Sequence, residues 1–501
     1  MRFIMNRANM KSWRILSSIL VLVMLTTLVS GTKAFAGEIE ETIEIPSYIT
    51  KTTIDGVEYL EFDSGEDMAW LRQHVMNKED GGTAGAYYCT HNIILTNDID
   101  MADYNATDGV NNGAWSGIGH GQQWIGYSGI FNGNGHMIYN IDVYTDQAVG
   151  PKGLLFNITK DATIKNLAVK GKVTSNRYIG GLVGRTTGSL TLENVVVDAE
   201  LALSQGNANA IGGLIGQCGS GQTVGGSKIT IKNCMAVGNY GSKTSSNPVG
   251  GMIGHVYGGY DVSIDNSYAA ANLECDGGDI AGLIAGNGTA TLKISNTYYL
   301  ESMADTSLIV MTANGDPSPV GPESMFVNAT SVAENDLKSA DFIESKLKNF
   351  KADSTSGLQI GNGYPIPNEV NSIQAAFEGF ACIGEPKTAY QVGEYFDLAG
   401  AYFVAKYSGG YNLYADYVIN NTEPLTVDDK TIVVSLSRGS ETGSQEFSIT
   451  VEDIQRIEIQ TPPKKTSYVE NQKFNQKGMV VVAYDSQGNS KEIIPIHLME
   501  L

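Results

Sequence analysis

Between residues 164 and 299 the hydrophobic and polar positions of the chain repeat as a phrase with two parts. The first part is an apolar residue, any residue, an asparagine and usually a short apolar run. Its five asparagines, at intervals of 28, 39, 33 and 30 residues, are Asn166, Asn194, Asn233, Asn266 and Asn296. The second part is an apolar pair bracketed by glycine or alanine, as in Gly181-Leu182-Val183-Gly184. Two phrases that recur in a fixed order with variable spacers predict a stacked solenoid.

Each repeat is interpreted as one coil of a parallel β-helix, with a strand at each phrase and a third strand in the spacer. Stacking the next coil ~4.8 Å away pairs the backbone N–H and C=O groups along the stack. The five asparagines would then lie above one another at a corner and form an amide ladder. This assigns them a structural role in preference to ligand binding.

The segments before the repeats predict a signal and a cap. Four basic residues precede an apolar run at 15–29, and Ala34-Phe35-Ala36 offers a cleavage site, so residues 1–36 read as a secretory signal peptide. Residues 37–89 predict an N-terminal capping segment, in which Ser64 begins a short helix. The apolar residues of that helix, at spacings of three and four, are Met68, Leu71 and Val75.

The β-helix itself is expected over residues 90–300. The alternation around Ile99 predicts a first strand, in which Asp98 and Asp100 would face solvent. Residues 301–370 are interpreted as an insertion, a C-terminal cap and a linker. The helix-like spacing of Phe342, Ile343, Leu347 and Phe350 predicts the cap, and the glycines and prolines of 361–367 predict the linker.

A second kind of repeat follows. Lys387, Tyr390, Phe396, Gly400 and Ala405 recur at a constant offset of 78 residues as Lys465, Tyr468, Phe474, Gly478 and Ala483. Alternating and β-branched runs between them predict strands of an all-β sandwich over 371–452. The second copy has only residues 453–501, so it is expected to be partial, either because the natural chain continues or because the copy is degenerate.

Composition narrows the choice of partner and compartment. The net charge of -21 repels phosphate, so nucleic acid is not an expected partner. Membrane insertion of the mature chain is not expected either, and no cofactor is predicted. The five cysteines do not form a disulfide framework; Cys234 fills a core position of the repeat, and a bridge from Cys218 to Cys234 stays open.

These phrases resemble those of GLUG-motif proteins, secreted bacterial right-handed β-helices that include the repeat region of immunoglobulin A peptidases. The stretch Gly129-Ile-Phe-Asn-Gly133-Asn-Gly-His136-Met-Ile-Tyr-Asn140 resembles the opening of that fold. The modules after about residue 378 are similar to bacterial immunoglobulin-like domains of the third group. The resemblance implies a right-handed parallel β-helix followed by immunoglobulin-like modules, placed outside the cell or on its surface. The peptidase activity does not carry over, because the zinc-binding HExxH pattern is absent from the six histidines His74, His91, His120, His136, His255 and His497.

Candidate chemistry is sparse. A glycosidase needs two carboxylates across a cleft, and no paired acidic cluster recurs near Arg177 and Arg185, the only arginines at 90–300. Asp98, Asp100 and Asp103 offer oxygen ligands for calcium, but no metal site is assigned. Stacking of a sugar on the aromatic residues Trp115, Trp124 and Tyr127 is weighed against packing at the first corner, which is favoured.

The sequence therefore favours a non-enzymatic extracellular protein that presents a β-helix face for adhesion, with a glycan or a host surface protein as partner. The alternative is a carbohydrate-active enzyme, a polysaccharide lyase or glycosidase, on the same scaffold. A third possibility is a passive structural protein of the cell surface. Two carboxylates facing each other in a groove would favour the enzyme.

Overall fold

The computed structural model describes residues 45–76, 87–104, 115–120, 125–145, 150–204, 210–219, 226–242, 248–275, 280–288, 290–303, 309–310, 323–470 and 472–493. The expected signal peptide at 1–36 and Trp124 lie outside these residues. The chain divides into two units, 1–48 and 49–501, and all strands and helices named below belong to the second. Within the described ranges, no helix is long and apolar enough to span a membrane.

The protein is all-β, as the sequence predicts, and three sheets hold most of its strands. The long sheet contains β1 (Thr50–Ile54), β2 (Val57–Phe62), β4 (Ile93–Leu95), β5 (Ile99–Asp100), β7 (Ile130–Asn132), β8 (Met137–Tyr144), β11 (Ala162–Ser175), β14 (Leu190–Leu203), β17 (Ser227–Lys232), β18 (Met235–Ser242), β21 (Tyr260–Cys275), β24 (Thr291–Leu300) and β25 (Met325–Val332). The middle sheet contains β3 (Tyr87–Cys89), β6 (Ile125–Tyr127), β10 (Phe156–Thr159), β13 (Val183–Thr186), β16 (Ile215–Cys218), β20 (Ile253–Val256) and β23 (Ile284–Asn287). The short sheet contains β9 (Lys152–Gly153), β12 (Ile179–Gly180), β15 (Ile211–Gly212), β19 (Val249–Gly250) and β22 (Ile280–Ala281).

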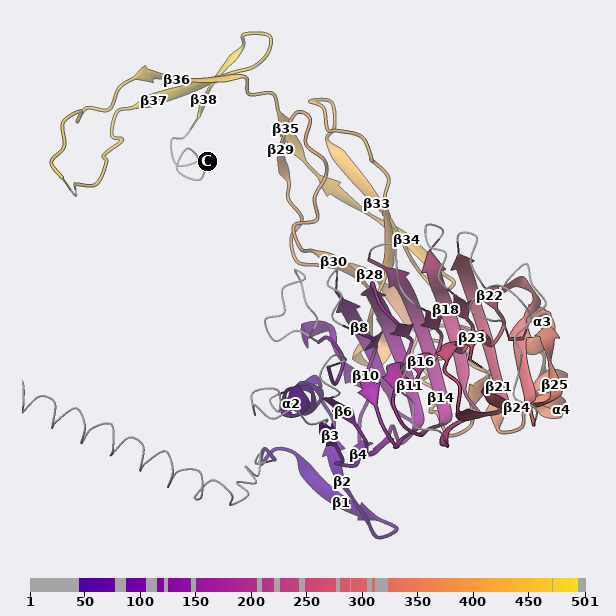
Figure 1. Ribbon diagram of the computed structural model, residues 1–501. Coiled ribbons are helices and arrows are strands. Elements are labelled where there is room, and N and C mark those ends of the chain that lie inside the picture. The colour runs from indigo at the N-terminus through magenta and orange to yellow at the C-terminus, as the bar shows by residue number, and fades with distance from the viewer. Residues whose placement is uncertain are drawn as a thin grey trace, which may run out of the picture. The chain divides into compact units, whose positions relative to one another are not determined.

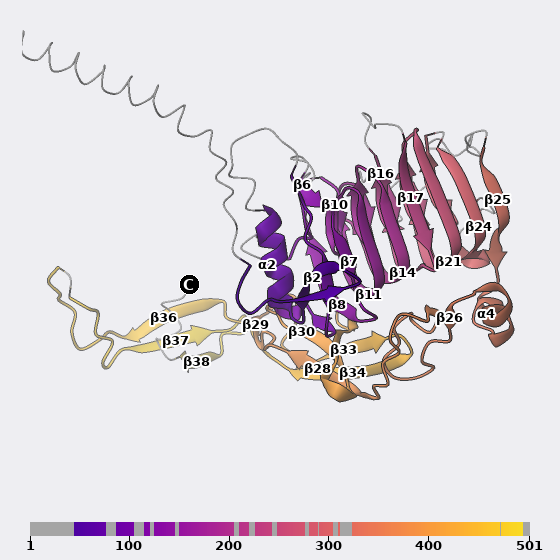
Figure 2. The same ribbon diagram turned by 90° about the horizontal axis from the view of Figure 1, so that it is seen from below.

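From β9 to β24 the chain visits the short, middle and long sheets in that order, again and again. Neighbouring strands in each sheet are parallel, apart from the β1–β2 hairpin. Figures 1 and 2 show the strands of successive circuits side by side, with colour running from violet to salmon along the stack. The three sheets thus form one stack whose repeat unit is a three-strand circuit.

Register places equivalent residues of the phrase above one another. Ile164 pairs with Leu192, Leu192 with Ile231, Ile231 with Ile264, and Ile264 with Ile294. These side chains are at most 1% exposed, as are the apolar residues Leu182, Leu214, Met252 and Leu283 of the second phrase. The core is therefore built of aligned columns, and a residue in a column contacts its counterparts in the circuits on either side.

The glycines of the second phrase are required because the backbones of successive circuits approach each other closely there. A Cβ on Gly181 would lie 2.0 Å from the carbonyl oxygen of Gly213, and one on Gly213 would lie 2.2 Å from that of Gly251. No side chain fits at such a distance, so only glycine lets the corners of successive circuits stack.

The N-terminal cap contains the expected helix, α2 (Gly65–Met76). Ser64 Oγ accepts a bond of 3.4 Å from the amide of Asp67, whose carboxylate accepts from the amide of Ser64 at 3.1 Å. This reciprocal pair satisfies donors at the start of the helix. Met68, Leu71 and Val75 are all fully buried, which confirms the predicted apolar face.

The stack extends beyond the expected range of 90–300 at both ends. Strand β2 pairs with β4 before it, and β25 pairs in parallel with β24 after it. Helices α3 (Glu334–Leu337) and α4 (Ala340–Lys346) follow, and the α4 residue Phe342 packs edge-on against Tyr298 with ring centroids 4.9 Å apart. The sequence signal ended early because β25 keeps an asparagine, Asn328, without a glycine phrase after it.

The segment 361–367 is not the linker that its glycines and prolines suggested. Strands β26 (Phe350–Lys351) and β27 (Ile366–Pro367) pair there, Ile366 is fully buried, and the carbonyl of Pro365 accepts a hydrogen bond from the Tyr268 hydroxyl on the long sheet. Glycine and proline serve tight turns at this place, so the prediction of a linker was wrong.

Residues 377–452, called here the C-terminal module, fold as short sheets around a separate core. Its sheets are β28 (Phe377–Ile383), β30 (Tyr402–Tyr407) and β31 (Asn412–Tyr414); β32 (Asp416–Ile419), β33 (Thr431–Arg438) and β34 (Glu441–Ser448); and β29 (Ala389–Gln391) with β35 (Thr450–Glu452). The core includes Tyr390, Phe403, Leu425, Ile432 and Val434, each at most 2% exposed.

The second copy of this module holds a three-stranded sheet of β36 (Arg456–Thr461), β37 (Val480–Tyr484) and β38 (Ser490–Ile493). Its repeated tyrosine makes the same bonds as the first copy. Tyr390 donates to the carbonyl of Lys387 and accepts from the amide of Asp397, and Tyr468 does the same with Lys465 and Asn475. The 78-residue repeat thus encodes one local arrangement, called here the tyrosine clamp, in which the tyrosine hydroxyl links a carbonyl three residues before it to an amide seven residues after it.

Candidate functional site

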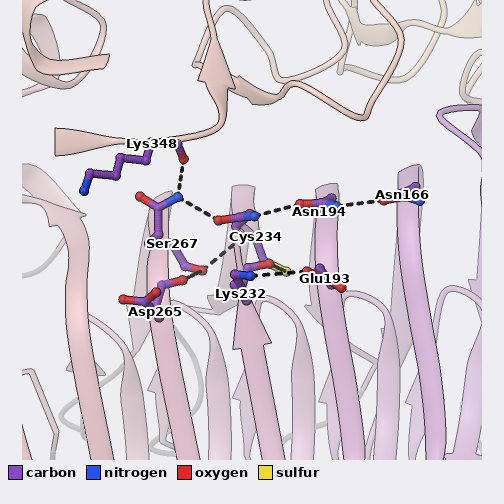
Figure 3. Close-up of polar contacts among 10 residues, drawn as sticks. Asn166, Glu193, Asn194, Lys232, Cys234, Asp265, Ser267 and Lys348 are labelled. Carbon is purple, nitrogen blue, oxygen red and sulfur yellow. Dashed lines mark hydrogen bonds and ion pairs between the residues drawn. The ribbon is translucent and has the colours of Figure 1, made fainter. Parts of the chain in front are cut away.

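The five asparagines of the repeat hold equivalent positions at a corner of the long sheet, and Figure 3 shows the part of this column that contains Asn166 and Asn194. Asn194 donates to Asn166 at 2.7 Å, Asn233 to Asn194 at 2.8 Å, and Asn266 to Asn233 at 2.7 Å. The fifth, Asn296, donates instead to the Asp265 carboxylate at 3.2 Å. All five backbones are left-handed, with φ between 44° and 56°. Asparagine suits the corner because it tolerates that conformation and its amide bonds to the next circuit.

Asp98 and Asp100 do not face solvent as expected. Asp98 accepts hydrogen bonds from His136 Nδ1 at 3.2 Å, the Met137 amide at 2.8 Å and the Tyr411 hydroxyl at 2.8 Å. Burial alone would raise the pKa of Asp98, but these bonds outweigh it and lower the pKa. The solvent-facing prediction was wrong because the C-terminal module covers this strand.

The other sequence candidates are packing residues. Trp115 is 2% exposed and donates from Nε1 to the carbonyl of Leu154 at 2.7 Å, and Tyr127 is fully buried; packing is therefore confirmed for both. Cys218 and Cys234 are free and buried. Across the described ranges, no group of three or more His, Cys, Asp or Glu side chains is arranged to hold a metal ion.

The candidate site is a cleft of about 860 Å³ between the outer face of the long sheet and the C-terminal module. One wall comes from equivalent positions of successive circuits, on β8, β11, β14 and β18. The opposite wall comes from the module and from a loop near Asp353. The polar and aromatic residues of the lining are Asn140, Asp142, Lys170, Lys172, Asp198, Glu200, Asn239, Gln359, Asn362, Tyr402, Phe403, Tyr407, Tyr414, Asp416, Tyr417, Arg438 and Ser440.

Register arranges the charges of the first wall in two rows. Asp142 pairs with Lys172, Lys172 with Glu200, and Glu200 with Asn239, so acid and base alternate along the stack. In the second row Lys170 pairs with Asp198, and Lys170 Nζ lies 2.5 Å from Asp198 Oδ2. Each row presents carboxylate acceptors and ammonium donors at the ~4.8 Å spacing of the strands.

Two carboxylates of this wall lie in contrasting environments. Burial and the neighbouring Asp416 raise the pKa of Glu200. Burial also acts to raise the pKa of Asp198, but Lys170 and Arg438 outweigh it and lower the pKa. Burial lowers the pKa of Lys170, and the negative charge of Asp198 acts in the opposite direction. The short contact between the two side chains is that of an ionised Asp198 beside an ammonium group.

Burial likewise raises the pKa of Asp142, with Lys172 acting in the opposite direction. The cleft therefore holds carboxyl groups whose pKa values are shifted in opposite directions: those of Glu200 and Asp142 are raised, and that of Asp198 is lowered.

Aromatic rings line the wall opposite. Tyr402 and Tyr414 are perpendicular, with centroids 5.3 Å apart, and Tyr417 tilts against Phe403 at 5.4 Å. Tyr417 is 48% exposed, so a large part of its surface is open to a ligand.

Hydrogen bonds attach the module to the stack. Asn140 Oδ1 accepts from the amide of Tyr414 at 2.8 Å, and Asn140 Nδ2 donates to the carbonyl of Asn412 at 2.5 Å. The side chain of Asn140, at the irregular step where β8 pairs with β11, thereby pairs with β31 as a neighbouring strand would. Together with the Tyr411–Asp98 bond, this contact fixes the two walls of the cleft.

The loop beside the cleft is organised by one carboxylate. Asp353 is 8% exposed and accepts from the amides of Ile360 at 3.1 Å, Gly361 at 2.9 Å and Gly363 at 3.0 Å. These bonds hold Gln359 and Asn362 at the rim.

Sequence reasoning missed the cleft residues. The sequence did contain a signal for them, because Lys170 and Lys172 lie two residues apart, as do Asp198 and Glu200. In a strand, this spacing places both members of each pair on one face. The five asparagines, by contrast, are absent from the lining.

Comparison of the chain with protein-family models, curated proteins and solved structures finds no match.

Proposed function

We propose that this chain is an extracellular surface protein that binds a saccharide in the cleft between the long sheet and the C-terminal module. The observation that carries the proposal is the composition of the cleft, where alternating acids and bases face tyrosine rings. Carboxylates accept from sugar hydroxyls, ammonium groups donate to them, and a phenol ring stacks on the apolar face of a sugar.

Size and charge support this ligand class. The volume of about 860 Å³ falls in the range of ~300–1,000 Å³ typical of small-molecule sites, which suits a short oligosaccharide. Because acids and bases alternate, the cleft favours a neutral, hydroxyl-rich ligand over a phosphate. The net charge of -21 further disfavours nucleic acid.

As part of the same proposal, the stack is a right-handed parallel β-helix of the GLUG type and the C-terminal modules are immunoglobulin-like. The in-register parallel circuits and the repeated tyrosine clamp support this reading. On this proposal the protein lies outside the bacterial cell or on its surface, where a glycan or a host surface protein is available for adhesion.

A specific observation favours a second candidate, a glycoside hydrolase in the same cleft. Asp198 and Glu200 lie two residues apart on β14, so their Cβ atoms are ~6.7 Å apart on one face of the strand. Inverting glycosidases hold their two carboxyl groups ~6.5–9.5 Å apart, a separation that side chains projecting from these two Cβ positions on one wall of the cleft would need to reach. The more easily protonated Glu200 would serve as the acid, and the ionised Asp198 would serve as the base for water.

A glycan array probed with the secreted protein, followed by a reducing-end assay on each glycan it retains, separates the two candidates. Binding without release of reducing ends supports the binding protein. Release that is abolished in Glu200→Gln, with binding kept, supports the hydrolase. A chain that retains no glycan contradicts both.

A further inference from the structure

A second cluster of aromatic and basic side chains lies on the middle sheet, away from the cleft. Its Arg185, His255 and Tyr257 are half-buried, whereas Tyr178 is 8% and Gln217 is 1% exposed. Arg185, Gln217 and His255 occupy one row across β13, β16 and β20, in register on three successive circuits. Tyr178 and Tyr257 flank the row. We call these five residues the arginine–tyrosine patch; none of them lines the cleft.

The patch is held in place by its own contacts. The guanidinium carbon of Arg185 lies 5.1 Å from the centroid of the Tyr178 ring, and its Nε donates to Gln217 Oε1. The Tyr257 ring stands edge-on to His255, with ring centroids 4.6 Å apart. These contacts fix the rotamers of the patch before any ligand arrives, which limits the entropy lost on binding.

The charge of the patch contrasts with that of the chain. Arg177 and Arg185 are the only arginines between residues 90 and 300 of a protein with net charge -21. Burial lowers the pKa of Arg185, and the nearby like charge of Arg177 lowers it further. The exposed Lys160 holds its ammonium 5.5 Å from the centroid of the Tyr88 ring. Like charges held near each other repel, and a bound anion relieves that repulsion.

We propose that the arginine–tyrosine patch is a separate binding site for an acidic saccharide, with its anionic group on Arg185 and a sugar ring against the half-buried Tyr257. A guanidinium offers parallel N–H donors that match a carboxylate, and Arg185 is preorganised by stacking on Tyr178. Burial lowers the pKa of His255, which keeps the imidazole neutral at neutral pH and available to hydrogen-bond a hydroxyl.

The test is a titration of the full secreted chain with oligogalacturonate, with a sulfated oligosaccharide of similar length, and with carboxyl-reduced oligogalacturonate as the neutral match. Wild type is expected to bind at least one acidic probe and not the reduced one; which acidic probe binds tells carboxylate from sulfate. Arg185→Gln is expected to weaken binding by about tenfold or more, the loss of one charge-assisted contact. The exposed Arg177→Gln is expected to weaken it less while keeping the fold.

Two control variants test whether the loss of binding is specific to the arginine–tyrosine patch. Lys228→Gln removes one exposed positive charge from the long sheet and should leave affinity unchanged. Asn239→Trp fills the cleft and should also leave binding of the acidic probe unchanged, which separates this site from the proposed cleft. Failure of wild type to bind either acidic probe, equal binding of the reduced probe, or equal losses in Arg185→Gln and Lys228→Gln would each overturn the proposal.

Discussion

At the scale of single residues, the asparagine column shows how one side chain meets two demands. Asn233 is 2% exposed, its φ is 52°, and its amide bonds to asparagines on both sides. Replacement of Asn233 therefore tests backbone conformation and amide ladder together.

Asn233→Ala is expected to destabilise the stack by about 2–4 kcal/mol, because it loses two buried hydrogen bonds and strains a left-handed position. Asn233→Gly loses the same bonds but accepts the backbone angle, so its thermal midpoint should lie between those of Asn233→Ala and wild type. Thermal unfolding followed by circular dichroism measures both. Equal midpoints for the two variants would show that the left-handed angle contributes nothing.

The acids of the cleft are expected to affect stability with opposite signs. The folded pKa of Asp198 is lowered, so its carboxylate stabilises the fold above its unfolded pKa of about 3.9, and this contribution is lost as the pH falls through the folded pKa. The folded pKa of Glu200 is raised, so its ionisation at neutral pH opposes folding.

Thermal midpoints at pH 7 should therefore fall in Asp198→Asn and rise in Glu200→Gln. At pH 3 both differences should shrink, because Glu200 becomes protonated and because the unfolded chain now binds a proton at Asp198 that folding must release. A Glu200→Gln variant less stable than wild type at pH 7 would contradict the assigned environment of Glu200.

Residue roles were predictable from the sequence where the partner is an equivalent residue of the next circuit. The repeat itself predicts such a partner, as for Asn194 or Cys234. Asp98 was misassigned because its partner, Tyr411, lies 313 residues away in a different module. Local alternation reveals that a side chain faces outward but not what comes to cover it.

At the scale of elements, the strands and the helix α2 follow from periodicity, while the connecting segments do not. The segment 361–367 has the composition of a linker, yet the loop that leads into it depends on one carboxylate, that of Asp353, which satisfies three amides. Composition cannot distinguish a glycine that gives flexibility from one that permits a tight turn.

Asp353→Ala is expected to lower the thermal midpoint and to open residues 354–363 to proteolysis, because three amides lose their acceptor. Asp353→Asn keeps one acceptor oxygen and should show a smaller effect. Asp485→Ala, which removes similar bonds to the amides of Gln487 and Asn489 from an exposed turn, is the matched control and should leave 354–363 protected. Cleavage of 354–363 at the wild-type rate in Asp353→Ala would show that the loop does not depend on the carboxylate.

At the scale of the whole molecule, the cleft exists because the C-terminal module is attached to the stack instead of serving as a free spacer. Its walls come from four strands of the long sheet and from a module whose docking residues, Asn412 and Tyr414, belong to no repeat shared with the stack. The sequence predicted both domains, but it could not predict the site between them.

The most direct test of that site compares two tryptophan substitutions in one row of the long sheet. Asn239 lines the cleft, and its register partner Asn272, which is also exposed on the next circuit, does not. Calorimetric titration with a saccharide retained on the array should show binding lost in Asn239→Trp and kept in Asn272→Trp. Unchanged affinity in both variants would contradict a ligand site in the cleft.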